Sequence, residues 1–258
     1  MKNQLLLLLV SLLILSCSKD DETSEDSTAT LKLKKVYRNG EIYDEYEYNN
    51  NKISKSTYYS GSIDEEGNNE VWRVNYYEYV NDVVIRNSYD SDNILIYTRK
   101  YYRTTDNTQI RRDDYDTSGA LYSYAIYNGY NNSCSHTSIE YFSNDDTLTS
   151  RDNIEYTDSN CSYSVTTYTN NNLVDYQQTY IKDDKVSAYK STVIEPFALN
   201  SSKIIGNTIS RTFKDSNNQT NNSNSYTSDY EYNEDNYPIS ETRTYLDGDI
   251  VEFTYEYY

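Results

Sequence analysis

Few side chains of this chain are suited to covalent chemistry, and its single histidine is His136. A Ser–His–acid or Cys–His nucleophilic site would have to use this imidazole. No nucleophile-elbow motif accompanies it, so we interpret His136 as a surface or turn residue at a loop-to-strand junction. One histidine and two well-separated cysteines in the folded region also do not match the ligand spacings of zinc sites.

Paired carboxylates are abundant, and three pairs stand out: Glu45/Glu47, Asp113/Asp114 and Glu231/Glu234. A glycoside hydrolase needs two carboxyl groups roughly 5–9 Å apart across a cleft, and acidic turns reach that spacing by accident. Asp90-Ser91-Asp92-Asn93 lacks the glycine and the distal glutamate of an EF-hand loop. Asp and Asn are expected here because they tolerate left-handed backbone angles in turns. We therefore predict no catalytic residue, no metal and no cofactor, and a hydrolase is the least favoured alternative.

Cys134 and Cys161 are candidates for a disulfide, because an exported protein meets an oxidising environment. In a simple meander they begin two strands that lie two strand spacings apart, about 9.5 Å. The Cα atoms of bridged cysteines lie within roughly 7 Å, so only an irregular loop at residues 128–133 could close the gap. The spacing favours free thiols, and the disulfide is the alternative.

The first sixteen residues have the layout of an export signal, with Lys2 followed by an apolar run from Leu5 to Leu15. This run is too short to span a bilayer as a mature helix. It ends in Ser16-Cys17, which resembles the lipobox of bacterial lipoproteins. The resemblance implies removal of residues 1–16 and acylation of Cys17, which then binds membrane lipid. An ordinary secretory signal with a chance cysteine is the alternative.

Residues 17–30 read as an acidic flexible tether. Their first part, Ser18-Lys19-Asp20-Asp21-Glu22, resembles the export signal that follows the lipidated cysteine in Bacteroidota surface lipoproteins. That resemblance implies a protein held in the outer membrane by its lipid and exposed at the cell surface. A solvated acidic linker is the alternative interpretation.

The charge of the chain excludes some partners. The formal net charge is -18, and removal of residues 1–16 takes away one lysine, leaving 22 basic and 41 acidic side chains, or -19. Such a surface repels phosphate backbones, so we expect no nucleic acid as a partner. It equally disfavours docking on anionic lipid through a basic patch.

Tyrosine must supply most of the buried surface, because the chain has 33 Tyr and few aliphatic residues. A tyrosine buries a large ring while its hydroxyl stays wet, which suits a half-exposed sheet. Turn signals recur between alternating strands, and they predict directly opposed pairs on neighbouring strands. The predicted pairs are Tyr37/Ile42, Tyr48/Ile53, Tyr79/Val84, Tyr89/Ile94, Tyr115/Leu121, Tyr168/Leu173, Tyr180/Val186 and Tyr245/Ile250.

The pattern predicts one all-β domain over residues 31–258, a long antiparallel up-and-down meander of about seventeen strands. An open twisted or curled sheet is expected, and two packed sheets or a closed barrel are the alternatives. Residues 194–207 break the rhythm and read as a connection, a short helical turn or a crossing between sheets. Residues 214–225 read as a long hairpin loop. The outward faces carry too many charges for a membrane barrel.

The segment Tyr115-Asp116-Thr117-Ser118-Gly119-Ala120-Leu121 resembles the YD (Rhs-type) repeats of bacterial surface and toxin-shell proteins. The resemblance implies meandering sheets that curl into a spiral or shell. Residues 230–258 also resemble the ends of Bacteroidota lipoproteins of unknown role. Neither resemblance assigns an activity.

These observations predict a lipid-anchored cell-surface β protein without catalytic activity. We expect a binding module that presents its Tyr-rich sheet to a glycan or another extracellular polymer. A structural or protein-interaction component, holding a partner chain by a sheet edge or face, is the alternative. The tyrosines would in any case pack as cross-strand pairs in a leucine-poor sheet.

Overall fold

The computed structural model describes residues 31–63, 68–104, 109–129, 134–193 and 205–258. Residues 31–258 form one compact unit. The predicted signal peptide, Cys17 and the acidic tether lie outside the described residues. No helix among the described residues is long and apolar enough to cross a membrane.

The described residues form sixteen strands and two short 3-10 helices, in place of the predicted seventeen or so strands. In chain order they are β1 (Leu33–Arg38), β2 (Glu41–Asn49), β3 (Lys52–Ile63), β4 (Asn69–Val80), β5 (Val83–Tyr89), β6 (Leu95–Arg103), β7 (Ile110–Tyr115), β8 (Leu121–Asn128), β9 (Ser138–Ser143), β10 (Leu148–Tyr156), β11 (Tyr163–Thr169), β12 (Val174–Lys182), η1 (Lys190–Thr192), β13 (Thr208–Asp215), η3 (Asn222–Asn224), β14 (Tyr226–Tyr232), β15 (Pro238–Tyr245) and β16 (Ile250–Tyr257).

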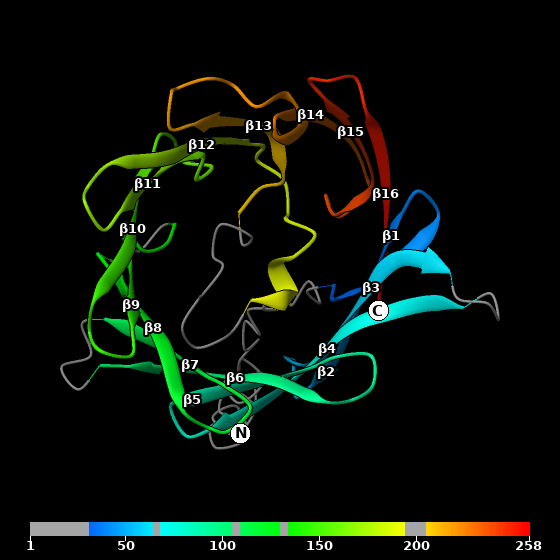
Figure 1. Ribbon diagram of the computed structural model, residues 1–258. Coiled ribbons are helices and arrows are strands. Elements are labelled where there is room, and N and C mark those ends of the chain that lie inside the picture. Colours follow the sequence, from blue (N-terminus) through cyan, green and yellow to red (C-terminus); the bar gives the residue numbers. More distant parts are fainter. Residues whose placement is uncertain (1–30, 64–67, 105–108, 130–133, 194–204) are drawn as a thin grey trace, which may run out of the picture. The chain divides into compact units, whose positions relative to one another are not determined.

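Each strand pairs antiparallel with its neighbours in sequence, which confirms the predicted up-and-down meander. The sheet does not stay open, because β1 also pairs with β16 and closes a barrel, the form given above as an alternative (Figure 1). The closing register places Val36 opposite Tyr255 and Lys35 opposite Glu256. Lys34 and Glu256 form an ion pair of 2.5 Å across the same seam. Closure leaves no free edge in the described sheet, which removes the usual site of strand-on-strand aggregation.

The two ends of the barrel differ in what they carry. We call the end with the β1–β2, β3–β4 and later odd-to-even turns the distal end. The other, proximal end holds the start of β1 at Leu33, the end of β16 at Tyr257 and the long connection from β12 to β13.

Part of the predicted strand register is confirmed. In four of the predicted pairs the two residues do lie directly opposite each other on neighbouring strands: Tyr37/Ile42, Tyr48/Ile53, Tyr79/Val84 and Tyr115/Leu121. Three others are wrong by one residue, since the observed pairs are Tyr89/Leu95, Tyr168/Val174 and Thr244/Ile250. These three turns have three-residue loops instead of two, and the third loop residue has a positive φ at Asn93, Asn172 and Gly248.

Five of the longer turns share one hydrogen-bonding pattern. The first side chain accepts hydrogen bonds from the backbone N–H groups two and four residues later, as Asp116 does from Ser118 at 2.9 Å and Ala120 at 3.0 Å. The same pattern holds at Asp90, Asp158, Asp215 and Asn233. The residue three positions on is left-handed each time, namely Asn93, Gly119, Cys161, Asn218 and Asn236.

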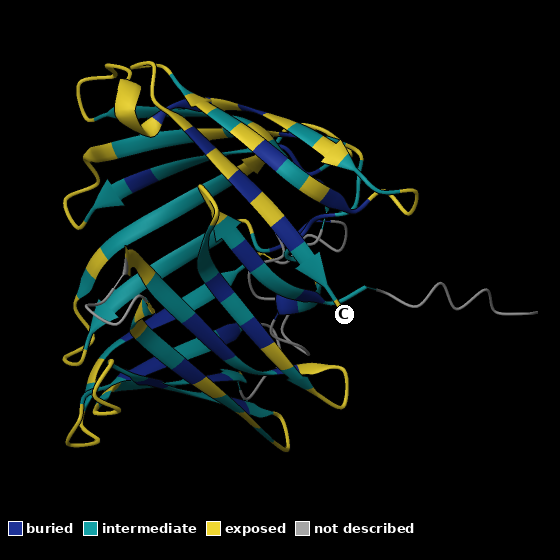
Figure 2. Ribbon diagram, turned by 90° about the vertical axis from the view of Figure 1, so that its right-hand side faces the viewer, coloured by how far each residue is buried: buried dark blue, intermediate teal, exposed yellow. Residues whose placement is uncertain are grey.

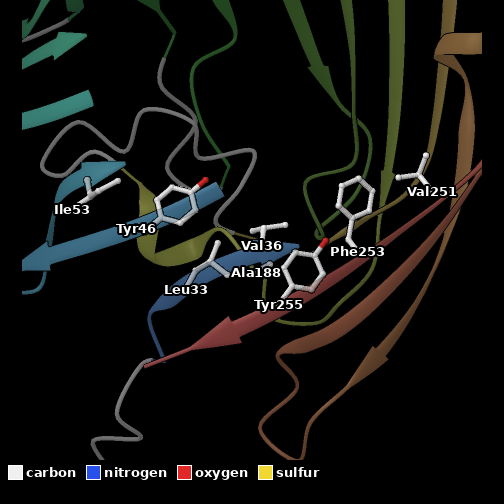
Figure 3. Close-up of a cluster of buried hydrophobic side chains, with 8 residues drawn as sticks. All are labelled: Leu33, Val36, Tyr46, Ile53, Ala188, Val251, Phe253 and Tyr255. Atoms are coloured by element: carbon white, nitrogen blue, oxygen red, sulfur yellow. The ribbon is translucent and has the colours of Figure 1, made fainter. Parts of the chain in front are cut away.

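Alternation along the strands gives the barrel two different faces. Buried and exposed residues largely alternate along β14 to β16, and the loops between strands are mostly exposed (Figure 2). The main apolar cluster lies on the inner face of β1, β2, β3 and β16 (Figure 3). It consists of Leu33, Val36, Tyr46, Ile53, Ala188, Val251, Phe253 and Tyr255.

Ala188 reaches this cluster because the chain leaves the wall after β12 and runs inside the barrel (Figure 1). The predicted Tyr180/Val186 pair is therefore wrong: Lys182 at the end of β12 pairs with Thr208 of β13, and Val186 pairs with Ile205. Of the predicted irregular stretch 194–207, residues 194–204 lie outside the described residues.

The inner segment is fixed to the wall by hydrogen bonds. Ser191 Oγ accepts from the Leu33 N–H at 2.9 Å and lies 2.9 Å from the Tyr48 hydroxyl. At the base of the segment, Asp183 accepts from the Asn207 N–H at 2.7 Å. Backbone groups that enter the barrel are thus paired, as buried polar groups must be.

The expectation of free thiols at Cys134 and Cys161 is wrong, because the two residues form a disulfide with a Cα–Cα distance of 5.5 Å. Neither cysteine begins a strand. Cys134 lies in the connection before β9, and Cys161 lies in the turn before β11. The strand spacing therefore does not set their separation, and the two loops approach each other at the proximal end.

Candidate ligand-binding site inside the barrel

Two cavities lie against the inner wall. The first has a volume of about 230 Å³ and is bounded by strands β11 to β16 and the inner segment, with Tyr163, Tyr180, Tyr189, Tyr226, Tyr230 and Arg243 among its walls. The second has a volume of about 300 Å³, with Arg112, Tyr127, His136, Tyr141, Asp152 and Tyr163 among its walls. Tyr163 borders both cavities and is stacked on Tyr180, with ring centroids 4.6 Å apart.

A buried carboxylate organises the first cavity. Glu241 is 2 % exposed and accepts from Ser228 Oγ at 2.7 Å, from the Tyr255 hydroxyl at 2.6 Å and from Arg243 at 2.8 Å. Burial raises the pKa of the Tyr255 hydroxyl, so this group stays protonated and donates. The Arg243 guanidinium also lies over the Tyr226 ring, 4.3 Å from its centroid. The arrangement presents fixed donors and aromatic faces.

The second cavity is built in a similar way around Asp152. Its carboxylate accepts from the Tyr141 hydroxyl at 2.9 Å and from Thr167 Oγ1 at 2.6 Å. Burial raises the pKa of Tyr141, and the neighbouring Asp152 charge acts in the same direction. Both cavities thus combine tyrosine rings with hydrogen-bonded carboxylates.

His136 lies in the connection just before β9, as predicted for a loop-to-strand junction, but its ring lines the second cavity instead of lying at the surface. Its ring makes an edge contact with Tyr127 at 4.8 Å, and its Nδ1 lies 2.8 Å from Ser135 Oγ. Burial lowers the pKa of the imidazole to about 4, which keeps it neutral near pH 7. Among the described residues no carboxylate bonds to this ring, so the Ser135–His136 contact has no orienting acid of the kind seen in a catalytic triad.

The carboxylate pairs singled out in the sequence do not converge. Asp113 and Asp114 are adjacent on β7 and therefore point to opposite faces. Asp114 binds Arg99 at 2.6 Å on the inner face, whereas Asp113 accepts from the Tyr102 hydroxyl at 2.7 Å on the outer face. They are not arranged across one cleft.

The remaining acidic candidates are paired with other side chains or backbone groups, or they face solvent. Glu45 and Glu47 form ion pairs with lysines, at 3.2 Å and 2.8 Å. Glu231 accepts from Ser240 Oγ at 3.0 Å, and Glu234 is exposed in the β14–β15 turn. Asp90 uses Oδ1 in its own turn. Within the described part of the chain, no three His, Cys, Asp or Glu residues are grouped to hold a metal ion.

Sequence reasoning missed a row of inner-face arginines, namely Arg73, Arg86, Arg99 and Arg112. They occur at a constant interval of thirteen residues on β4, β5, β6 and β7. Arg86 stands directly opposite Arg99, and Arg112 stands opposite Tyr101. The interval was the signal that could have revealed them, because it places one arginine on each of four successive strands, with Arg86 and Arg99 directly opposed.

The outer wall carries many polar side chains in the middle of its strands, although Trp72 and Tyr76 of β4 are also exposed there. Ion pairs join β1 to β2 and β2 to β3, as described above for Glu45 and Glu47. On β14, β15 and β16 the exposed positions away from the strand ends are polar, namely Thr227, Asp229, Thr242, Thr244, Glu252 and Thr254, whereas the exposed Ile239 and Ile250 lie near the starts of their strands. A barrel wall in contact with lipid tails instead needs a continuous apolar band.

Fold and site together define a class: a sixteen-stranded up-and-down β-barrel with a polar outer wall and an interior lined by tyrosine and arginine. No protein-family model matches the chain, and no curated protein matches it.

Solved structures do resemble it. A porin-like protein from Bacteroides uniformis ATCC 8492 aligns with a TM-score of 0.55 and 13 % identity, over 83 % of this chain and 90 % of that one. A porin-like protein from Bacteroides vulgatus ATCC 8482 aligns with a TM-score of 0.49 and 12 % identity, over 88 % and 99 %. At 13 % identity, the similarity to the Bacteroides uniformis protein shows only that the two share a fold.

Proposed function

We propose that the protein is a lipid-anchored, cell-surface, non-catalytic β-barrel that binds a glycan or another extracellular polymer in its interior. Acylated Cys17 would hold it in the outer membrane. The net charge of -18 makes nucleic acid an unfavourable partner.

One observation carries the proposal: the inner wall places aromatic faces next to fixed hydrogen-bonding groups around two cavities. A sugar ring has apolar C–H faces and a rim of hydroxyl groups, so it needs this combination. Tyr163 and Tyr180 supply stacked rings, while the hydroxyls and carboxylates of Asp152, Glu241 and their partners are already oriented by mutual hydrogen bonds. Pre-oriented groups lower the entropic cost of binding.

A membrane-spanning pore is the second candidate, and the porin-like name of a structural neighbour favours it. The polar outer wall weighs against this candidate, because charges such as Glu252 and Asp229 would face lipid tails. A protein-interaction component is a third candidate. A closed barrel leaves no strand edge for a partner in the described sheet, so that partner would have to bind a face or the turns.

A glycan array with the full-length protein, purified in detergent, tests the proposal. We expect binding to at least one class of polysaccharide, and a loss of about tenfold in affinity for Tyr163→Ala because this ring borders both cavities. Tyr168→Ala is the matched control, since Tyr168 lies on the same strand but on the outer face, beside Arg151. Absence of binding to any polysaccharide would refute the proposal.

A further inference from the structure

The arginine row on β4 to β7 forms a compact cationic cluster around one tyrosine. Arg73 donates to the Tyr97 hydroxyl at 3.3 Å and Arg86 donates to it at 3.0 Å. The Arg99 guanidinium lies over the Tyr97 ring, 4.8 Å from its centroid. Three guanidinium groups from three strands therefore surround one phenol.

Few carboxylates balance this positive charge. Asp114 is the shared counterion, at 2.6 Å from Arg99 and 2.8 Å from Arg112. Asp44 of β2 lies on the same face two strands beyond Arg73, opposite Tyr58 of β3, and accepts from the Tyr46 hydroxyl at 3.1 Å. Asp152 lines the second cavity together with Arg112. Four arginines thus share three carboxylates, an excess of positive charge in a protein whose net charge is -18.

The excess of positive charge lowers the pKa of the Tyr97 hydroxyl at the centre of the cluster. Burial by itself would raise the pKa of Tyr97, yet Arg86, a hydrogen bond with Ser88, Arg99 and Arg73 together lower it below its usual value. In contrast, burial raises the pKa of neighbouring Tyr77. The environment at Tyr97 therefore favours negative charge.

The cluster also has donors to spare. The Nε atoms of Arg73, Arg86 and Arg112 are buried and have no hydrogen-bond partner. A guanidinium carries five N–H donors in a planar fork that matches a carboxylate or sulfate group. Buried donors without acceptors are costly, so an incoming oxyanion would be stabilised by them.

The position of the cluster suits a ligand that arrives from solvent. Arg86, Tyr97 and Asp114 lie within a few residues of the distal turns of their strands. Arg112 also lines the cavity of about 300 Å³, which connects the cluster to the tyrosine-lined space. Next to Arg73, the Trp72 ring is 45 % exposed and lies 4.0 Å from the Arg73 guanidinium.

We propose that Arg73, Arg86 and Arg99 form a binding site for an oxyanion group, a carboxylate or a sulfate. The site deepens the proposed function and rests on it in one respect: the group is taken to be a charged substituent of the bound glycan, whose rings stack on aromatic side chains nearby. A polymer without charged groups lacks the partner that these arginines require.

Matched polymers test this directly with the full-length protein in detergent. Dextran sulfate is compared with dextran, and oligogalacturonate is compared with its methyl ester, so each pair differs only in the oxyanion. We expect at least tenfold tighter binding of the charged member in at least one pair, measured by calorimetry. Inorganic sulfate and phosphate are titrated separately, with the melting temperature as the readout.

Variants then locate the effect. Arg86→Gln and Arg73→Gln are expected to weaken binding of the charged polymer about ten- to a hundredfold, as for loss of a charged hydrogen bond. Arg73→Lys keeps the charge but loses the fork and is expected to recover part of the affinity. Arg151→Gln is the control, because Arg151 carries the same charge on the outer face over Tyr168.

The outcomes separate the two proposals. Equal binding of charged and neutral polymers, unchanged in both Gln variants, overturns the oxyanion site and leaves glycan binding standing. Stabilisation by inorganic sulfate that Arg86→Gln removes, without binding to any polymer, supports the oxyanion site and overturns glycan binding. If Arg86→Gln does not fold, Arg73→Gln and the wild-type polymer pairs still decide the question.

Discussion

Arginine and tyrosine share the interior of this barrel in a regular way, with guanidinium groups placed over or beside rings. Arg211 lies over Tyr180, at 5.6 Å from its centroid, and Arg243 lies over Tyr226 at 4.3 Å. Such contacts contribute roughly 0.5–2 kcal/mol each, more where water is excluded. They let a leucine-poor chain bury charge, because the ring supplies apolar surface and its hydroxyl supplies a hydrogen bond.

The Cys134–Cys161 disulfide gives a prediction at this scale. The native protein should not react with a thiol reagent at these positions unless a reductant is added. Replacing both cysteines by serine should lower the free energy of unfolding by about 2–4 kcal/mol, because the bond closes a loop in the unfolded chain. Chemical denaturation checks the second value, and reduced wild-type protein should match the double variant. Labelling without reductant would contradict the bond.

His136 predicts a specific pH dependence. Burial lowers the pKa of the folded imidazole to about 4, whereas the unfolded value is near 6.5. The unfolded chain therefore binds an extra proton between these values, and stability falls as the pH drops from 6.5 to 4. The loss should reach about 3 kcal/mol and then level off below pH 4.

The measurement compares the unfolding free energy of the wild type and His136→Asn at several pH values. Acidic turn residues such as Asp116, whose pKa is lowered mainly by hydrogen bonds, act in both proteins at lower pH. The difference between the two curves therefore isolates the histidine. Identical slopes between pH 6.5 and 4 would contradict a buried, neutral imidazole.

At the scale of elements, the three-residue turns set the strand register. In five of these turns the first side chain accepts hydrogen bonds from the backbone, as Asp116 does, and the third loop residue is left-handed. Because the side-chain period of a strand is two, an added loop residue must be absorbed at the turn to keep the same face inside. Irregular register positions next to these turns, as between Asp114 and Tyr115, absorb it.

Substitution of Gly119 measures how much the left-handed turn position contributes to stability. Its φ is +83°, and a Cβ placed there would meet no atom within 4 Å, so only backbone strain opposes a side chain. Gly119→Ala should therefore lower the free energy of unfolding by about 1–2 kcal/mol. Thr117→Ala in the same loop is the control and should change stability by less than about 0.5 kcal/mol. Equal effects in denaturant titrations would show that the left-handed position is not decisive.

For the whole molecule, the balance between its outer and inner walls decides where it can reside. A polar exterior with ion pairs is compatible with water, and an interior with its own apolar cluster does not need lipid to stay folded. If Cys17 carries the proposed lipid, the barrel itself is expected to stay folded after its release from the membrane.

A cleavable tether tests this expectation. A specific protease site inserted within residues 17–30 should allow the barrel to be released from the membrane fraction into detergent-free buffer as folded protein. Uncut protein should stay with the membrane, and a Cys17→Ser chain should lose incorporation of labelled fatty acid. Retention of the cut barrel in the membrane would instead favour the spanning pore.

The amino-acid sequence by itself determined the local structure: tyrosine-rich alternation, polar turns and an up-and-down meander over residues 31–258. These features depend on neighbours in sequence, so pairs such as Tyr37/Ile42 were predictable. The YD-repeat resemblance stays a prediction, as does the lipid anchor.

The tertiary structure alone decided the rest. Pairing of β1 with β16, the passage of Ala188 through the interior and the Cys134–Cys161 bond join residues far apart in the chain. Alternation tells which residues share a face, but closure decides which face is inside. Only closure therefore places Arg86 and Arg99 on the inside of the barrel.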